Sequence, residues 1–251
     1  MEIQKADIWK RISAWLFDVI LLLIVTVGFA TAVSAIVNYD KYSAELTAHY
    51  ERYEQQFGID LFLSEEDFNK LSEEEQTEYK NLYQQAMDEF AKDEAVQYTN
   101  SMIFNLALVI LNVSILLGYL VVYFLVPVLF KNGQTLGKKI FGIAVMRAHG
   151  VKLPNSILFV RSIIGQCVIG TLVPIYFGLL GGIGIIMLIL LLLLQLGLFF
   201  FTQNRSTIHD LLSYTVAVDM ASQRIFENEA DLIAYKTALE EEKKAQEAMQ
   251  A

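Results

Sequence analysis

Charged side chains within long apolar runs are the residues of this chain best placed to do chemistry. Asp18 is the only ionisable residue in the 26-residue stretch 12–37, and Arg11 directly precedes that stretch. Because seven residues make two helical turns, Arg11 and Asp18 share one helix face. A carboxylate inside a membrane span costs about 2.5 kcal/mol or more to insert, so it usually faces a charged partner or a wet cavity. The pair indicates a buried polar site.

Three further charges are expected to lie near this pair. Arg161 is about 7 Å deep in a later apolar stretch, a depth similar to the 9 Å or so expected for Asp18. Arg205 and Asp210 follow the last apolar stretch, where the chain returns to the same side. Each charge would be costly alone, so we expect mutual pairing. The sequence leaves open whether Asp18 pairs with Arg161 or with Arg11.

Two interpretations of this cluster remain. It is a structural ion-pair network that fixes helix packing, or it is a proton or cation site in which Asp18 changes its protonation or partner. Asn105 and Asn112 are also seven residues apart on one helix face. We expect them to line the same polar core or to form hydrogen bonds between helices.

No pattern in the sequence predicts an enzyme, a cofactor or a metal centre. The three histidines are scattered and lack zinc-ligand spacing. The segment 133–139, GQTLGKK, is one residue short of a P-loop and lacks the hydroxyl residue after the lysine. Nucleic-acid binding is disfavoured because no basic stripe lies on a soluble domain.

The elements that must position these residues are membrane spans of about 20 residues or more. We predict an all-α integral membrane protein with four transmembrane helices, a small extracytoplasmic helical insert and a short cytoplasmic β-hairpin-like loop. Gly178 and Gly182, near the break between the last two spans, either permit close helix approach or form the turn. The predicted segments are 1–37 with the first span, the acidic insert 38–101, the second span 102–130, the loop 131–155, the third and fourth spans 156–202, and the tail 203–251.

Charge is distributed unevenly and predicts the orientation. Residues 38–100 contain 16 acidic and 5 basic residues, whereas the net charge of the whole chain is −9. Lysine and arginine gather before the first span, between the second and third, and after the fourth. All three places lie on one side if there are four spans, so we expect both termini to be cytoplasmic. Helical spacing of apolar residues and capping boxes at Ser64 and Ser72 predict two or three helices in the insert.

Three segments resemble the RDD family of bacterial membrane proteins. They are Arg11-x-x-Ala14-x-x-x-Asp18, then Gly133-x-Thr135-x-Gly137-Lys138-Lys139, and finally the run from Arg205 through His209-Asp210 to Val218. The resemblance covers 5–37 and 102–220 and omits the acidic insert. It implies that the name-giving arginine and two aspartates of the family are Arg11, Asp18 and Asp210.

Together these features predict a multi-pass protein of the bacterial cytoplasmic membrane that transports a monovalent cation or a proton through the Asp/Arg site. Because four helices make a thin bundle, we expect a homodimer or a partner membrane protein. The alternative is a scaffold or accessory subunit that binds a partner through the acidic insert.

Overall fold

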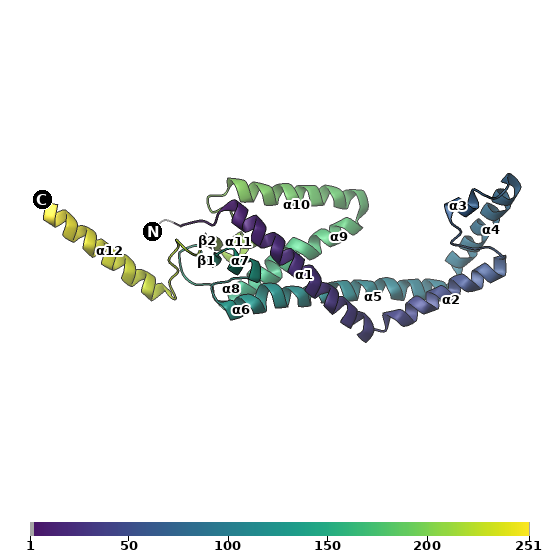
Figure 1. Ribbon diagram of the computed structural model, residues 1–251, viewed down its shortest axis with the longest axis horizontal. Coiled ribbons are helices and arrows are strands. Elements are labelled where there is room, and N and C mark those ends of the chain that lie inside the picture. Colours follow the sequence, from purple (N-terminus) through teal and green to yellow (C-terminus); the bar gives the residue numbers. More distant parts are fainter. Residues whose placement is uncertain (1–2, 251) are drawn as a thin grey trace. The chain divides into compact units, whose positions relative to one another are not determined.

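The computed structural model describes residues 3–250, and side chains up to residue 247. The chain forms two compact units, which are described separately. The membrane unit contains residues up to Val27 and from Ile115 onward, and the insert unit contains Gly28–Ser114. Figure 1 labels the helices and strands of both.

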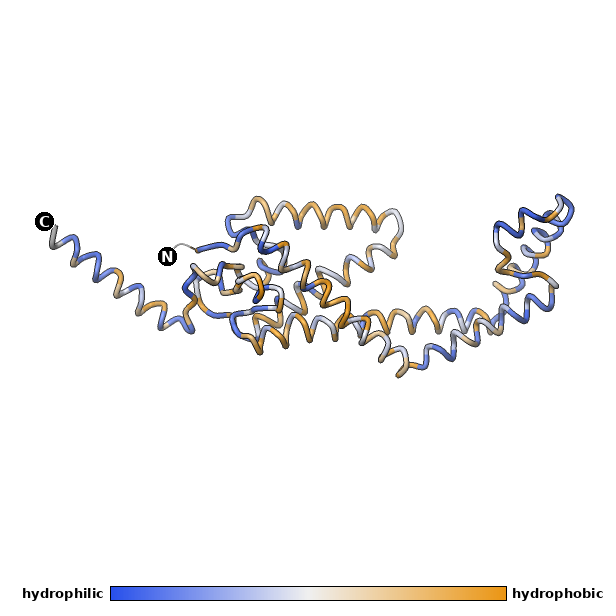
Figure 2. The backbone as a smooth tube through the Cα atoms, viewed as in Figure 1, coloured by the Kyte–Doolittle hydropathy of each residue, from blue (hydrophilic) through white to orange (hydrophobic). Residues whose placement is uncertain are grey.

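Four helices among the described residues are long and apolar enough to cross a membrane. They are Ile8–Ile36, Glu94–Phe130, Asn155–Leu179 and Gly181–Phe201. Figure 2 shows the hydrophobic runs along them, in contrast to the hydrophilic insert helices and C-terminal helix. The predicted all-α membrane architecture with four spans is confirmed. The helix of the second span begins at Glu94, directly after an insert helix that ends at Lys92.

Two spans contain wide, π-helical segments, each followed by a proline. The second span runs as α5 (Glu94–Tyr119), η1 (Leu120–Leu125) and α6 (Val126–Phe130). The third runs as α8 (Asn155–Phe159), η2 (Val160–Leu172) and α9 (Val173–Leu179). Pro127 and Pro174 lack the N–H of a regular helix, which favours a local change of hydrogen-bond pattern. Such π segments are frequent at functional sites, and η2 carries Arg161.

The third and fourth spans form a helical hairpin. Helix α9 ends at Leu179 and α10 (Gly181–Phe201) begins two residues later, as Figure 1 shows. Gly181 has φ +62°, a conformation that glycine adopts without strain. A methyl group added at Gly178 or Gly182 would meet no atom within 4 Å. Gly181 therefore serves the turn, and among the described residues no other helix approaches Gly178 or Gly182 closely.

A small antiparallel sheet lies beside the spans. Strand β1 (Ile143–Arg147) pairs with β2 (Thr215–Asp219), in a register that sets Val145 opposite Ala217. The predicted hairpin-like turn is present, because Gly150 N–H donates to the Arg147 carbonyl and one bridge joins Met146 to Lys152. The five-residue ladder, however, joins the loop to the segment after the last span. Both strands are buried on both faces, so the sheet ties distant parts of the chain together.

Two short helices and one long helix complete the membrane unit. Helix α7 (Leu136–Ile140) precedes β1, and α11 (Ile208–Ser213) precedes β2. Helix α12 (Glu229–Gln250) forms the C-terminal segment. Leu21 and Leu22 of α1 (Ile8–Ile36) pack against a core formed by the second and third spans, which fixes the first span within the membrane unit.

The insert unit has a core of its own. It contains α2 (Tyr39–Phe57), α3 (Glu65–Phe68), α4 (Glu73–Lys92) and the start of α5. Tyr53 and Phe90 are buried there, with ring centroids 5.3 Å apart. The capping box predicted at Ser72 is formed with Glu75, and Ser64 accepts a hydrogen bond from the Asp67 N–H. The insert is thus a packed helical body with a solvated acidic surface.

Candidate functional site

Asp210 joins two arginines from two different spans. Its Oδ1 lies 2.5 Å from Arg161 Nη1, and its Oδ2 lies 3.4 Å from Arg11 Nη2. The Asp210 side chain is 1% exposed, that of Arg161 4% and that of Arg11 12%. Removing one partner of such a buried pair commonly costs about 3–5 kcal/mol, because the remaining charge stays uncompensated. The cluster therefore connects the first span, the third span and the segment after the fourth.

Local capping sets the position of Asp210 on α11. Thr207 is the N-cap residue, and both its backbone N–H and its hydroxyl donate to Asp210 Oδ2, at 3.0 and 2.8 Å. Burial alone would raise the pKa of Asp210, but the charges of Arg161 and Arg11, with the hydrogen bond from the Thr207 N–H, outweigh it and hold the pKa well below its usual range. Asp210 is therefore a permanent anion at physiological pH.

A close approach between α11 and η2 brings Asp210 to Arg161. A methyl group added at Gly165 would lie 2.6 Å from His209 Cβ, so only glycine permits this spacing. Arg161 also donates to the hydroxyl of Thr215, the first residue of β2. Glycine at 165 and threonine at 215 thus hold the guanidinium between α11 and the sheet.

Asp18 has different partners from those expected. Thr135 Oγ1 donates to Asp18 Oδ2 at 2.5 Å, and the Gly137 N–H donates to Asp18 Oδ1 at 2.8 Å. Asp18 is 1% exposed, and within the described part of the chain it forms no ion pair. The expectation that Asp18 pairs with Arg161 or Arg11 is therefore wrong. The physical reason is that Asp210 occupies both guanidinium groups, while the start of α7 offers two neutral donors to Asp18.

Gly137 makes this second arrangement sterically possible. A methyl group there would lie 2.9 Å from Asp18 Oδ1 and would also meet the carbonyl oxygen of Ala14. Helix α7 therefore lies directly against α1. Thr135 caps α7 by accepting from the Lys138 N–H while it donates to Asp18.

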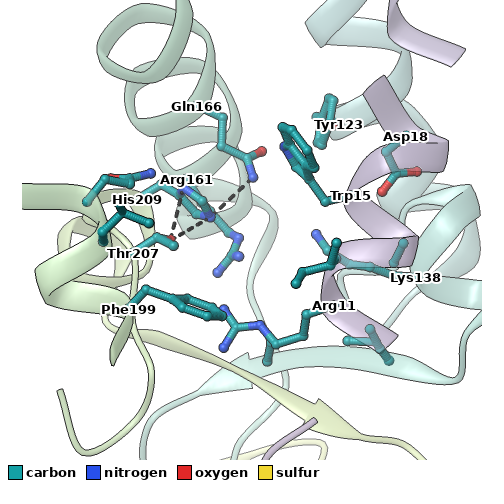
Figure 3. A pocket seen from close by; sticks show the side chains of 16 residues that line it. Arg11, Trp15, Asp18, Tyr123, Lys138, Arg161, Gln166, Phe199, Thr207 and His209 are labelled. Atoms are coloured by element: carbon teal, nitrogen blue, oxygen red, sulfur yellow. Dashed lines mark hydrogen bonds between the residues drawn. The ribbon is translucent and has the colours of Figure 1, made fainter. Parts of the chain in front are cut away.

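A cavity of about 320 Å³ lies beside both aspartate sites. Figure 3 shows Arg11, Trp15 and Asp18 on one side of it, and Gln166, Thr207 and His209 on the other. Lys138 also lines the cavity, and burial followed by the charge of Arg161 lowers its pKa to about 8. Burial lowers the pKa of His209 to about 3, so that ring is neutral at physiological pH.

Other expected site residues contribute differently. The Arg205 carbonyl accepts a hydrogen bond from Arg11 Nη1 at 2.8 Å, whereas the Arg205 side chain forms no ion pair with a described residue. Arg205 has φ +50°, a strained conformation that places this carbonyl in the cluster. Asn105 and Asn112 belong to the insert unit, so their role as polar lining stays a prediction.

Sequence reasoning missed the part of the site that comes from the loop between the second and third spans. Thr135, Gly137 and Lys138 lie outside the spans, and depth along a helix says nothing about a loop that folds back. The motif Gly133-x-Thr135-x-Gly137-Lys138-Lys139 was a usable signal, because it offers a hydroxyl, a backbone donor and a cation within four residues.

The RDD family model matches residues 5–214. The chain belongs to the RDD family. Comparisons with curated proteins and with solved structures find no match. In this RDD protein Arg11 pairs with Asp210, whereas Asp18 is bound by the loop that carries Thr135.

Proposed function

We propose that this RDD-family membrane protein moves a proton or a monovalent cation across the bilayer, with Asp18 as the group that changes its charge. One observation carries the proposal. Asp18 is a buried carboxylate in a span, it lines a cavity, and the donors that bind it are neutral. Because Asp18 has no arginine partner, it can take up and release a proton or a cation without breaking an ion pair. Asp210, in contrast, is held between two arginines.

The surroundings of Asp18 support a reversible change of this kind. Intramembrane carboxylates commonly mark ion or proton pathways. Thr135 Oγ1 keeps a second hydrogen bond when Asp18 releases it, because it also accepts from the Lys138 N–H. When Asp18 takes up a proton or a cation, its hold on α7 weakens, and α7 is directly followed by β1 in the chain. This link gives the charge change a route to the cytoplasmic sheet.

The proposal includes a location. The lysine and arginine bias supports cytoplasmic termini and an acidic insert on the outside, and the family resemblance implies a bacterial cytoplasmic membrane. No enzymatic step is part of it. Since four spans form a thin bundle, a complete pathway requires a second copy or another membrane protein.

Flux through purified protein tests the proposal. We would reconstitute it in proteoliposomes with a trapped pH dye and apply pulses of Na⁺, Li⁺ and K⁺. Wild type should give an ion-driven pH change that Asp18→Asn abolishes. Asp231→Asn, an exposed substitution on α12, is the matched control and should behave as wild type. Equal flux from wild type and Asp18→Asn would overturn the assignment of Asp18.

The second candidate is a scaffold that binds an envelope partner through the insert. It is favoured by the insert's own packed core, centred on Tyr53 and Phe90, which the site does not require. Deleting 45–95 should then abolish capture of a partner from solubilised membranes while membrane insertion is unchanged. Retention of every captured protein would refute the scaffold, and unchanged ion flux in the same deletion would favour transport.

A further inference from the structure

The cavity carries more positive than negative charge. Arg11, Arg161 and Lys138 line it as cations, Asp18 lines it as a carboxylate, and His209 is neutral. Asp210 is outside the lining but pairs with both arginines, so its charge is counted with theirs. The balance is three positive and two negative charges, a surplus of one positive charge. An unbalanced charge in a poorly hydrated site is unfavourable and is relieved by a bound counter-ion.

The surplus is concentrated on one side chain. Asp210 is shared by the two arginines, and Asp18 is satisfied by Thr135 and Gly137. The Lys138 ammonium has no hydrogen-bond or ion-pair partner in the part of the chain that the structure describes. Figure 3 places Lys138 on the same side of the cavity as Asp18 and Arg11. A lysine in this setting is a point-charge site for an anion.

Most of the apolar wall comes from two spans and lies beside the polar Gln166, Gln195 and Thr207. Ile12 and Trp15 of α1 face the cavity, as do Leu196 and Phe199 of α10. Arg11 also stacks over the Phe199 ring, with 4.9 Å from its Cζ to the ring centroid, so the apolar and cationic parts of the wall adjoin. At about 320 Å³ the cavity is at the small end of the range for ligand sites. It suits a small molecule and is too small for a whole phospholipid.

We propose that this cavity binds an organic monoanion, a carboxylate with a short apolar body, whose head group is held by Lys138 and whose body lies against Trp15 and Phe199. This inference goes beyond the proposed function, because it concerns equilibrium binding and holds whether or not Asp18 takes part in flux. Loss of the negative charge of Asp18 increases the positive surplus. Protonation of Asp18 and binding of the anion therefore favour one another.

Quenching of Trp15 measures this binding directly. The chain has two tryptophans, so the Trp9→Phe variant leaves Trp15 as the single reporter. The probe is octanoate with a bromine at its chain end, added to protein in phosphatidylcholine nanodiscs. We expect saturable quenching that weakens at least about tenfold in Lys138→Gln, since a hydrogen bond to a charged group is lost. Lys139→Gln, on the same helix but exposed, is the matched control and should bind as before.

Three results would overturn the inference. The first is equal quenching by a trimethylammonium probe with the same brominated chain, which would reveal unselective partition of amphiphiles. The second is unchanged affinity in Lys138→Gln. The third is loss of binding when the nanodiscs contain phosphatidylglycerol, which would show that the Lys138 ammonium binds a lipid head group. Tighter binding in Asp18→Asn would support the coupling, and it can be observed even if that variant and wild type show no ion flux.

Discussion

The hydroxyl of Ser162 donates to the backbone carbonyl of Tyr123, at 2.6 Å, and joins the third span to the second. In a regular helix that carbonyl would accept from residue 127, but Pro127 has no N–H. Ser162 is buried and directly follows Arg161 in η2. We expect the bond to compensate for the proline, and it fixes the helix turn that presents Arg161 to Asp210.

We expect Ser162→Ala to lower the free energy of unfolding by about 1–3 kcal/mol, because a buried carbonyl loses its partner. Thermal unfolding in nanodiscs measures the change, and Ser156→Ala, at an exposed position of α8, is the control. Pro127→Ala restores the missing N–H, so the double variant should lose less than the sum of the two single losses. Strict additivity would contradict the compensation.

The charge cluster should show a ranked response to neutral substitutions. Arg161→Gln should cost about 3–5 kcal/mol of unfolding free energy, because it removes the shorter and more buried contact of Asp210. Arg11→Gln should cost less, since its contact is 3.4 Å long and its side chain is more exposed. Arg205→Gln should change stability by no more than about 0.5 kcal/mol, because only the backbone of that residue takes part. Thermal unfolding of the three variants under one condition tests this order. A larger loss of stability in Arg205→Gln than in the other two would contradict it.

Gly137→Ala should separate α7 from the first span. The added methyl group meets Asp18 Oδ1 at 2.9 Å and the Ala14 carbonyl, so we expect a loss of about 1–3 kcal/mol from overpacking and faster amide hydrogen exchange in 135–141. Gly178→Ala is the control, because its methyl group would meet open space and should be neutral or slightly stabilising. Equal exchange rates in both variants would show that α7 does not depend on Asp18.

Anion binding should weaken at alkaline pH. The pKa of Lys138 is lowered from 10.5 to about 8, so the ammonium is present below pH 8 and is lost above it. Affinity for the brominated octanoate should be nearly flat from pH 6 to 7.5 and fall by up to about tenfold per unit above pH 8. Lys138→Gln should show a flat profile. A wild-type profile that stays flat to pH 10 would show that Lys138 does not bind the head group.

The lowered pKa of Lys138 also predicts how the stability of the ligand-free protein depends on pH. Between pH 8 and 10.5 the folded protein binds fewer protons at Lys138 than the unfolded chain does. Its contribution to the free energy of unfolding therefore rises with pH through that window. Comparison of wild type with Lys138→Gln, by unfolding at pH 7.5 and 9.5, should show the difference between them shifting in favour of wild type. A shift in the opposite direction would contradict the lowered pKa.

The spans could be predicted from sequence because hydrocarbon thickness imposes a length, and a run of apolar residues satisfies it visibly. The depth argument placed Arg161 at the level of Asp18, and the return of the chain to the same side placed Asp210 near them. In the structure Arg161 and Arg11 both contact Asp210. The depth argument assigned Asp18 to the wrong partner, since pairing by opposite charge ignores neutral backbone donors. Nothing local in 131–155 indicates that its strand pairs with Thr215–Asp219, because register between distant segments depends on the packing of all four spans.

The Arg11–Asp210 contact links residues 199 positions apart in the chain. During synthesis the first span enters the bilayer long before its counter-charge exists, and Arg11 must stay in water or among lipid head groups until residue 210 emerges from the ribosome. Closing the cluster is therefore a late event of biogenesis. A nascent chain truncated at residue 204 should hold its first span loosely, and one extended past β2 should acquire a protease-resistant core in a single step.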